Sequence, residues 1–186
     1  MQLEYTMKGI VFKEFAEMLE QTFGEEMYDS IVEVCDLPSG GVYSAVGTYD
    51  HMELVSLVVE LSKRTGLAVD VLVQAFGKYL FGRFHELFPV FFDHETGFTF
   101  LDSIENVIHV EVLKLYPEAT LPKFDSAIAE DGNSMELTYY STRHFADLAV
   151  GLIQGTFEHW NEEVEIEMED LTEGEEQKVR FYIKRA

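Results

Sequence analysis

The sequence has only one cysteine, one tryptophan and four prolines among its 186 residues. A lone cysteine, Cys35, cannot form an internal disulfide, a CxxC redox pair or a cysteine-rich zinc site. No uninterrupted apolar run approaches about 18 residues, and the N-terminus has no basic-then-apolar signal pattern. We therefore expect a soluble, cytoplasmic protein with no membrane-spanning segment, in which Cys35 is a buried, inert thiol.

Basic side chains are also scarce, because 13 Lys and Arg stand against 35 Asp and Glu, for a formal net charge of −22. A phosphate backbone or an anionic membrane surface would be repelled, so we exclude nucleic acid and membrane as partners. The segment from Glu158 to Glu176 is acidic throughout and contains no Lys or Arg. Such a run is most often a solvated face, and a docking surface for a basic partner is the alternative.

Apolar and aromatic residues are abundant: 47% of the chain is hydrophobic, and 15 Phe and 9 Tyr are present. A chain of 186 residues is long enough for one domain with a real core. Large flat side chains suit a wide apolar pocket, although most aromatic residues in any domain are core residues.

Helical periodicity dominates the first part of the chain. Apolar residues recur at three- and four-residue steps, which predicts helices over residues 12–23, 25–35, 50–66, 70–85, 101–115 and 145–153. Gly24 and Gly66 follow two of these segments as stop signals. Asp50, with Glu53 three residues later, predicts a capping box at the start of the third helix.

Alternation of apolar and polar residues replaces this pattern near the C-terminus. It predicts strands around residues 135–139, 164–168 and 179–183, the last two joined as a hairpin through the polar segment 172–175. We expect an α+β fold, with an N-terminal helical subdomain (about 7–66) followed by helices packed on a small antiparallel sheet (about 67–186). Residues 1–186 then form a single domain.

The segment Tyr139–Arg143 has the pattern Y-x-S-x-R. If its backbone is extended, Tyr139, Ser141 and Arg143 project from one face. A phenol, a hydroxyl and a guanidinium then converge as donors for one or two carboxylates. The alternative is a strand end that carries solvated side chains or a helix cap.

His109 lies on a predicted helix with apolar neighbours Ile108 and Val112. Such a histidine is more often a core residue than a metal ligand. Imidazole is nevertheless the usual protein ligand of haem iron, and apolar flanks suit a porphyrin face. His85, near Phe84 and Phe88, is the competing ligand candidate.

Several motifs in fixed order carry a resemblance to a known family. They are Met7-Lys8-Gly9-Ile10, Phe88-Pro89, His109 seven residues before Tyr116-Pro117, and Y-x-S-x-R at Tyr139, Ser141 and Arg143, about thirty residues after that His. In this combination the chain resembles the haem-nitric oxide/oxygen binding (H-NOX) family, bacterial haem sensors related to the haem domain of soluble guanylate cyclases. Met1–Thr6 precedes the usual start of the family.

The resemblance implies a haem b buried between the two parts of the chain. His109 would be the proximal ligand of its ferrous iron, while Tyr139, Ser141 and Arg143 would hold the propionates. Pro122 falls at the position of a proline that presses on the porphyrin and bends it. The family places apolar distal residues against the ring at two further positions, Val11 and Leu152.

The resemblance also bears on the ligand gas. O₂-binding members carry a distal tyrosine nine residues after the motif tyrosine, where this chain has Leu148. The polar residues that support that tyrosine align with Phe15 and Leu80. Bound O₂ draws charge from the iron and benefits from a nearby donor, which NO and CO need far less. We predict NO and CO complexes and no stable O₂ complex.

By the same resemblance, NO breaks the bond between the iron and His109, and stand-alone members act in trans on a histidine kinase or a cyclic-di-GMP enzyme. We therefore expect a gas sensor and not an enzyme. A haem enzyme such as a peroxidase would need distal acid–base groups, which the predicted pocket lacks. The residues also leave open a haem redox sensor and a haem-free interaction domain.

Overall fold

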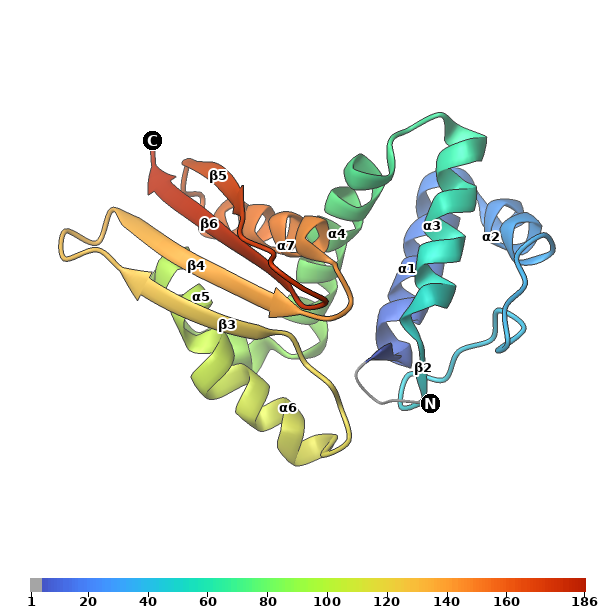
Figure 1. Ribbon diagram of the computed structural model, residues 1–186, viewed down its shortest axis with the longest axis horizontal. Coiled ribbons are helices and arrows are strands. Elements are labelled where there is room, and N and C mark those ends of the chain that lie inside the picture. Colours follow the sequence, from blue (N-terminus) through green and yellow to red (C-terminus); the bar gives the residue numbers. More distant parts are fainter. Residues whose placement is uncertain (1–4) are drawn as a thin grey trace.

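The computed structural model describes residues 5–186, so that only Tyr5 and Thr6 of the segment Met1–Thr6 are within it (Figure 1). The N-terminal half contains β1 (Thr6–Lys8), α1 (Gly9–Phe23), α2 (Glu25–Val32), β2 (Thr48–Asp50) and α3 (His51–Thr65). The remaining elements are α4 (Val69–Leu87), η2 (Pro89–Phe92), α5 (Gly97–Ser103), η3 (Ile104–Ile108), α6 (His109–Leu115), β3 (Lys123–Ile128), β4 (Ser134–Ser141), α7 (Ala146–His159), β5 (Val164–Asp170) and β6 (Gln177–Arg185).

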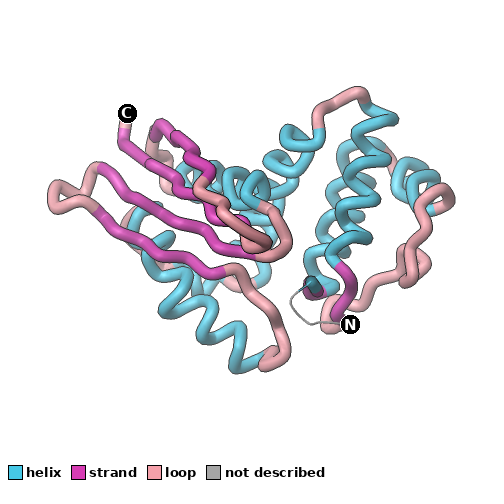
Figure 2. The backbone as a smooth tube through the Cα atoms, viewed as in Figure 1, coloured by secondary structure: helices cyan, strands magenta, loops and turns pink. Residues whose placement is uncertain are grey.

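The elements form two parts that meet along α4 and α7. Figure 1 shows helices α1 to α3 on one side of α4 and the larger sheet on the other. Figure 2 shows the long strands side by side in that sheet and the two short strands beside the N-terminus. The predicted α+β class is confirmed. In residues 5–186, no helix is long and apolar enough to cross a membrane.

The larger sheet is antiparallel, with strand order β3-β4-β6-β5 and with α7 inserted in the chain between β4 and β5. Leu137 pairs with Phe181, and Ile166 pairs with Ile183, as the predicted strands and hairpin require. The sequence pattern does not indicate β3 or the small β1–β2 sheet. These strands are short or polar on one side, so their alternation is weak.

Two cores share α4 and α7. The first joins α1 and α3 to Leu72, Phe76 and Leu80 of α4, and the second joins the sheet to Ile153 and Phe157 of α7. Half-buried Leu152 packs against both cores. The two cores are therefore continuous through this helix pair.

Three local expectations need correction. The Asp50 side chain caps α3 by accepting from the Met52 N–H, but Glu53 does not complete a capping box. Glu53 is buried and accepts a hydrogen bond from the Tyr43 hydroxyl at 3.0 Å instead. The helix predicted to reach residue 35 ends at Val32.

The predicted helix over 101–115 is also not a single α-helix. It begins earlier, at Gly97, and residues Ile104–Ile108 form a π-helical segment between α5 and α6. The His109 N–H bonds to the Ile104 carbonyl, five residues back. An apolar periodicity near 3.6 does not reveal one such widened turn.

The contact between α4 and α7 depends on paired glycines. A Cβ at Gly77 would overlap the Leu148 carbonyl oxygen, and one at Gly151 would overlap the Gln74 carbonyl oxygen. Backbone cannot yield as a flexible side chain can. We expect Gly77→Ala to lower the free energy of unfolding by about 1–3 kcal/mol, as overpacking does.

Gly82→Ala is the matched control, because Gly82 lies in the same helix and a Cβ there meets open space. It should raise stability by about 0.5–1 kcal/mol, since alanine is the better helix former. Urea unfolding of both variants measures the difference. Equal effects at the two positions would refute the close-packing explanation.

Candidate functional site

The three residues of the Y-x-S-x-R pattern lie together at the end of β4. Tyr139 and Ser141 share the inner face of the strand, and Arg143 follows in the turn. All three are buried. The Arg143 N–H donates to Ser141 Oγ at 3.1 Å, and the Phe145 N–H donates to the Tyr139 hydroxyl at 3.2 Å.

Arg143 is only 8% exposed, and its guanidinium bonds to main-chain carbonyls. Its Nη1 donates to the carbonyl oxygens of Thr6 and Thr120, both at 2.8 Å. Within the described residues it has no ion pair with a carboxylate, and burial lowers its pKa. Since a guanidinium has five N–H donors and a buried charge is costly without an anion, this arrangement suits a carboxylate supplied by a bound molecule.

His109 is the first residue of α6, and its side chain is 14% exposed. Its Nδ1 lies 3.1 Å from Glu105 Oε2, and its ring centroid lies 5.9 Å from that of Phe124. Phe124 in turn lies 5.6 Å from the ring of Tyr139. The neighbouring rings of His109, Phe124 and Tyr139 thus connect His109 with the Y-x-S-x-R residues.

Electrostatics favour a neutral His109. Burial lowers its pKa, and the nearby positive charge of Arg143 acts in the same direction, against the raising effect of Glu105. A neutral imidazole has a lone pair available for a metal. The described residues hold no group of three or more His, Cys, Asp and Glu side chains that could bind a metal ion.

His85, the competing candidate, lies elsewhere. Its ring is 4.4 Å from that of His159 and 5.1 Å from that of Phe92, in an aromatic group between α4 and the end of α7.

The residues aligned with the distal side belong to the first core. Phe15, Leu80 and Leu148 are buried in it, and half-buried Val11 and Leu152 pack against it. They come from α1, α4 and α7, and none has a polar side-chain atom. Pro122 lies on the other part of the chain, half-buried in the segment between α6 and β3.

Two residues that matter for the site do not stand out in the sequence. Glu105 contacts His109, and the signal that could have found it is the i, i+4 spacing on a predicted helix. Lys8 joins β1 to the segment after α6, because its Nζ lies 3.0 Å from Glu118 Oε1 and 4.7 Å from the centre of the Tyr116 ring. No local pattern predicts a contact over such a sequence distance.

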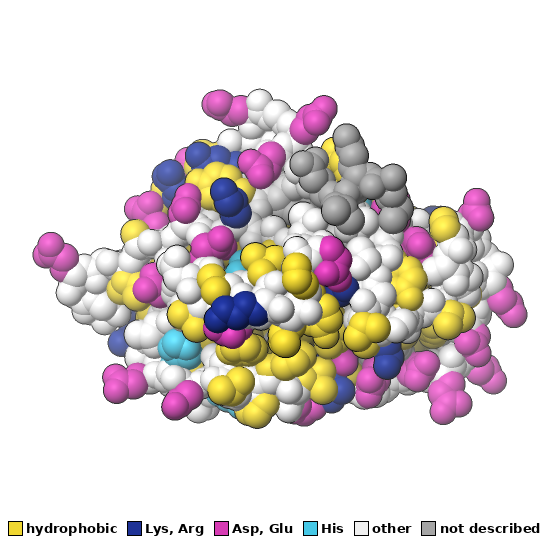
Figure 3. Space-filling model, turned by 90° about the horizontal axis from the view of Figure 1, so that it is seen from below, with side chains coloured by type: hydrophobic (Ala, Val, Ile, Leu, Met, Phe, Trp, Pro, Cys, Tyr) yellow, Lys and Arg dark blue, Asp and Glu magenta, His cyan; other side chains and the backbone are white. Residues whose placement is uncertain are grey.

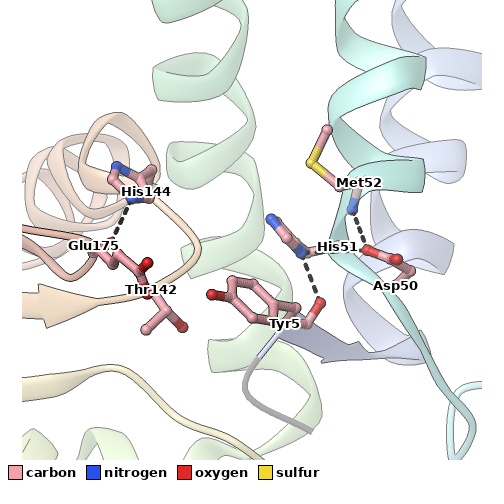
Figure 4. Close-up of a pocket in the computed structure, with 7 residues that line it drawn as sticks. All are labelled: Tyr5, Asp50, His51, Met52, Thr142, His144 and Glu175. Atoms are coloured by element: carbon pink, nitrogen blue, oxygen red, sulfur yellow. Dashed lines mark hydrogen bonds and ion pairs between the residues drawn. The ribbon is translucent and has the colours of Figure 1, made fainter. Parts of the chain in front are cut away.

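A pocket lies next to the Y-x-S-x-R residues, where the two parts of the chain meet (Figure 4). It is lined by Tyr5, Asp50, His51, Met52, Thr142, His144 and Glu175. Thr142 lies between Ser141 and Arg143, so the pocket adjoins the Y-x-S-x-R residues, but none of the predicted site residues lines it. His144 Nε2 lies 2.9 Å from the Glu175 carbonyl oxygen on one wall, and His51 Nδ1 lies 2.6 Å from the Tyr5 carbonyl oxygen on the other.

Comparison with known proteins gives the family. The sequence model of the Haem-NO-binding family matches residues 8–168, which is most of the chain. The protein belongs to the H-NOX family. The predicted resemblance is confirmed, and membership supports a haem-based gas sensor, since H-NOX proteins bind haem and serve as sensor domains.

Solved H-NOX structures agree. The Fe(II) unliganded H-NOX protein from K. algicida is 37% identical, with 97% of each chain covered and a TM-score of 0.88. The H-NOX from Shewanella woodyi, in the Fe(II)CO ligation state with IWP-051 bound, is 42% identical, with 97% of this chain and 95% of that chain covered and a TM-score of 0.81. An H-NOX protein from S. oneidensis in the Fe(II)NO ligation state is 26% identical, with 97% and 99% covered and a TM-score of 0.86.

The hydrogen bond at Tyr139 can be tested directly. Tyr139→Phe removes the acceptor of the Phe145 N–H and should lower the free energy of unfolding by about 1 kcal/mol. Tyr140→Phe is the control, because Tyr140 lies on the opposite, more exposed face of the same strand. It should change stability by less than about 0.5 kcal/mol. Urea unfolding at matched haem content measures both, and a larger loss in the control would contradict the placement.

Proposed function

We propose that this protein is a cytoplasmic sensor of NO that also binds CO, excludes O₂ and regulates a signalling partner in trans. The whole chain, 1–186, forms one haem domain, with its helical part at about 7–66 and its α+β part at about 67–186. The observation that carries the proposal is buried Arg143, which has no carboxylate partner in the described part of the chain and lies near a largely buried, neutral His109.

Each residue of the proposed haem site has its own chemical role. Ferrous haem b, when bound, supplies the iron that takes up NO or CO. His109 provides the single protein ligand, and its neutral state keeps a nitrogen lone pair available. Tyr139, Ser141 and Arg143 are donors for the two propionates. Pro122 would press on the porphyrin and bend it.

The other side of the pocket sets selectivity. Phe15, Leu80 and Leu148 lie in one apolar core with Val11 and Leu152 at its edge, so none of these residues offers a hydrogen bond to a ligand. O₂ needs such a donor, whereas NO and CO do not. The NO and CO ligation states of the S. oneidensis and S. woodyi relatives support this choice of gases.

In this proposal, α6 transmits the change at His109 to the rest of the chain. The residues of η3 and α6 are at most half-buried, with Ile104 and Ile108 packed against the second core, so we expect the helix that carries His109 to be lightly held. Loss of a bond between iron and His109 would leave α6 free to shift, and the Lys8 contacts with Tyr116 and Glu118 would connect such a shift to β1.

The exposed side of this segment is apolar in places, at Val107, Val110, Leu113 and Leu115. Figure 3 shows hydrophobic side chains gathered on the lower face, the side on which α6 lies in Figure 1. The proposed partner is a histidine kinase or a cyclic-di-GMP enzyme, so the chain itself needs no catalytic groups.

Oxygen exclusion is testable by mixing the reduced protein with air. The wild type should show no lasting O₂ spectrum. Leu148→Tyr should gain one, because its hydroxyl supplies the missing donor. Leu148→Phe has the same ring without the hydroxyl and should behave as the wild type. A stable O₂ complex in the wild type, read by absorption spectroscopy, would disprove the selectivity.

Loss of the His109 bond is testable without NO. His109→Gly, supplied with imidazole to retain haem, has no covalent link between the iron and α6. Its α6 amides should exchange with deuterium as they do in the NO-bound wild type, and faster than in the unliganded wild type. His85→Gly serves as the control and should respond to NO normally. If His109→Gly still needs NO to loosen α6, the proposed mechanism is wrong.

A further inference from the structure

One carboxylate oxygen connects His109 to a second element of the fold. Glu105 Oε2 lies 3.1 Å from His109 Nδ1 and also accepts a hydrogen bond from the Phe124 N–H at 3.1 Å. Glu105 belongs to η3 and Phe124 to β3. The carboxylate is therefore held from two directions, unlike a side chain that pairs only along its own helix.

The backbone around this contact is unusual. Ile104–Ile108 is π-helical, and the His109 N–H bonds to the Ile104 carbonyl five residues back. Such widened turns concentrate at functional sites. Here the π-helical segment contains Glu105 and ends immediately before His109.

The contact also differs from the other acid–base pair on the same helix. The Lys114–Glu111 pair is exposed, with side chains 63% and 44% accessible, whereas the His109 and Glu105 side chains are 14% and 35% accessible. An exposed pair contributes little, because water screens it. A hydrogen bond to a largely buried imidazole is screened much less.

The chemistry of the contact is directional. An ionised carboxylate only accepts, so Nδ1 of a neutral His109 must carry the proton, and Nε2 keeps the lone pair. Sharing that proton with a carboxylate makes the imidazole more basic than a bond to water or a carbonyl would. A more basic imidazole binds iron more strongly.

We propose that Glu105 is a positioning residue that fixes the tautomer of His109, strengthens its bond to iron and so sets how readily NO breaks that bond. This inference rests on the proposed function, because it takes His109 as the iron ligand. Glu105 itself makes no contact with the haem; it acts only through the imidazole.

The test is Glu105→Gln in the haem-loaded full chain. Glutamine retains the length of the side chain and an acceptor for the Phe124 N–H, but it removes the charge. Resonance Raman of the reduced, unliganded variant should show the iron–histidine stretch shifted to lower frequency. After NO is added, loss of the histidine bond should be about tenfold faster than in the wild type, as expected when a charge-assisted bond becomes a neutral one.

Glu111→Gln is the matched control, since it removes the same charge from an exposed position of α6. It should leave both the stretch and the rate unchanged. An unshifted stretch and an unchanged rate in Glu105→Gln would overturn the inference. A shift of equal size in Glu111→Gln would overturn it as well, because the effect would then be a general one of charge.

If Glu105→Gln does not fold, Glu105→Asp keeps the charge on a shorter arm. It should give a smaller shift in the same direction, and an unshifted band would again overturn the inference. Failure of the proposed function looks different. In that case the reduced wild type shows no iron–histidine stretch, or the stretch survives in His109→Gly.

Discussion

The Arg143 guanidinium donates from one nitrogen to the main-chain carbonyls of Thr6 and Thr120, which come from the two parts of the molecule. A buried guanidinium is costly unless its donors are satisfied, and carbonyls neutralise none of its charge. The positive charge of Arg143 is therefore not neutralised by any carboxylate in the described part of the chain. The position of Arg143, near Tyr139, Ser141 and His109, is consistent with the proposed binding of a haem, which has both carboxylates and a metal.

The same junction explains how a small change at His109 can reach the rest of the chain. The segment between α6 and β3 contacts the N-terminal part directly through Glu118 and Lys8. It is also joined to that part through Arg143, which donates to the carbonyls of both Thr120 and Thr6. On the other side, Glu105 joins the π-helical segment to β3. Helix α6 has no fully buried residue, and its flanking segments are held by these polar contacts together with half-buried Ile104 and Ile108 in the second core.

Much of the fold could be predicted because its signals are periodic. Helices α1, α3 and α4 bury apolar residues at helical spacing, strands β5 and β6 alternate as predicted, and Gly66 ends α3 in the left-handed conformation that favours glycine. The shared face of Tyr139 and Ser141 follows from the alternation of a strand, whereas Arg143 lies in the turn after β4 and its position does not. The parts that escape prediction have no period: the π-helical turn before His109, the role of buried Glu53 in binding the loop at Tyr43, and the Lys8 contact with Glu118. Each depends on residues distant in the sequence or on one irregular turn, so motif resemblance is needed to connect His109 with the rest of the site.

We propose that iron lies between the two parts of the chain, bound by His109. The most direct measurement is the anomalous scattering of crystals of the haem-loaded protein at the iron absorption edge. The account predicts one strong peak within bonding distance of His109 Nε2, with the propionates toward Arg143. A peak beside His85 or at another histidine, with His109 unligated, would contradict it.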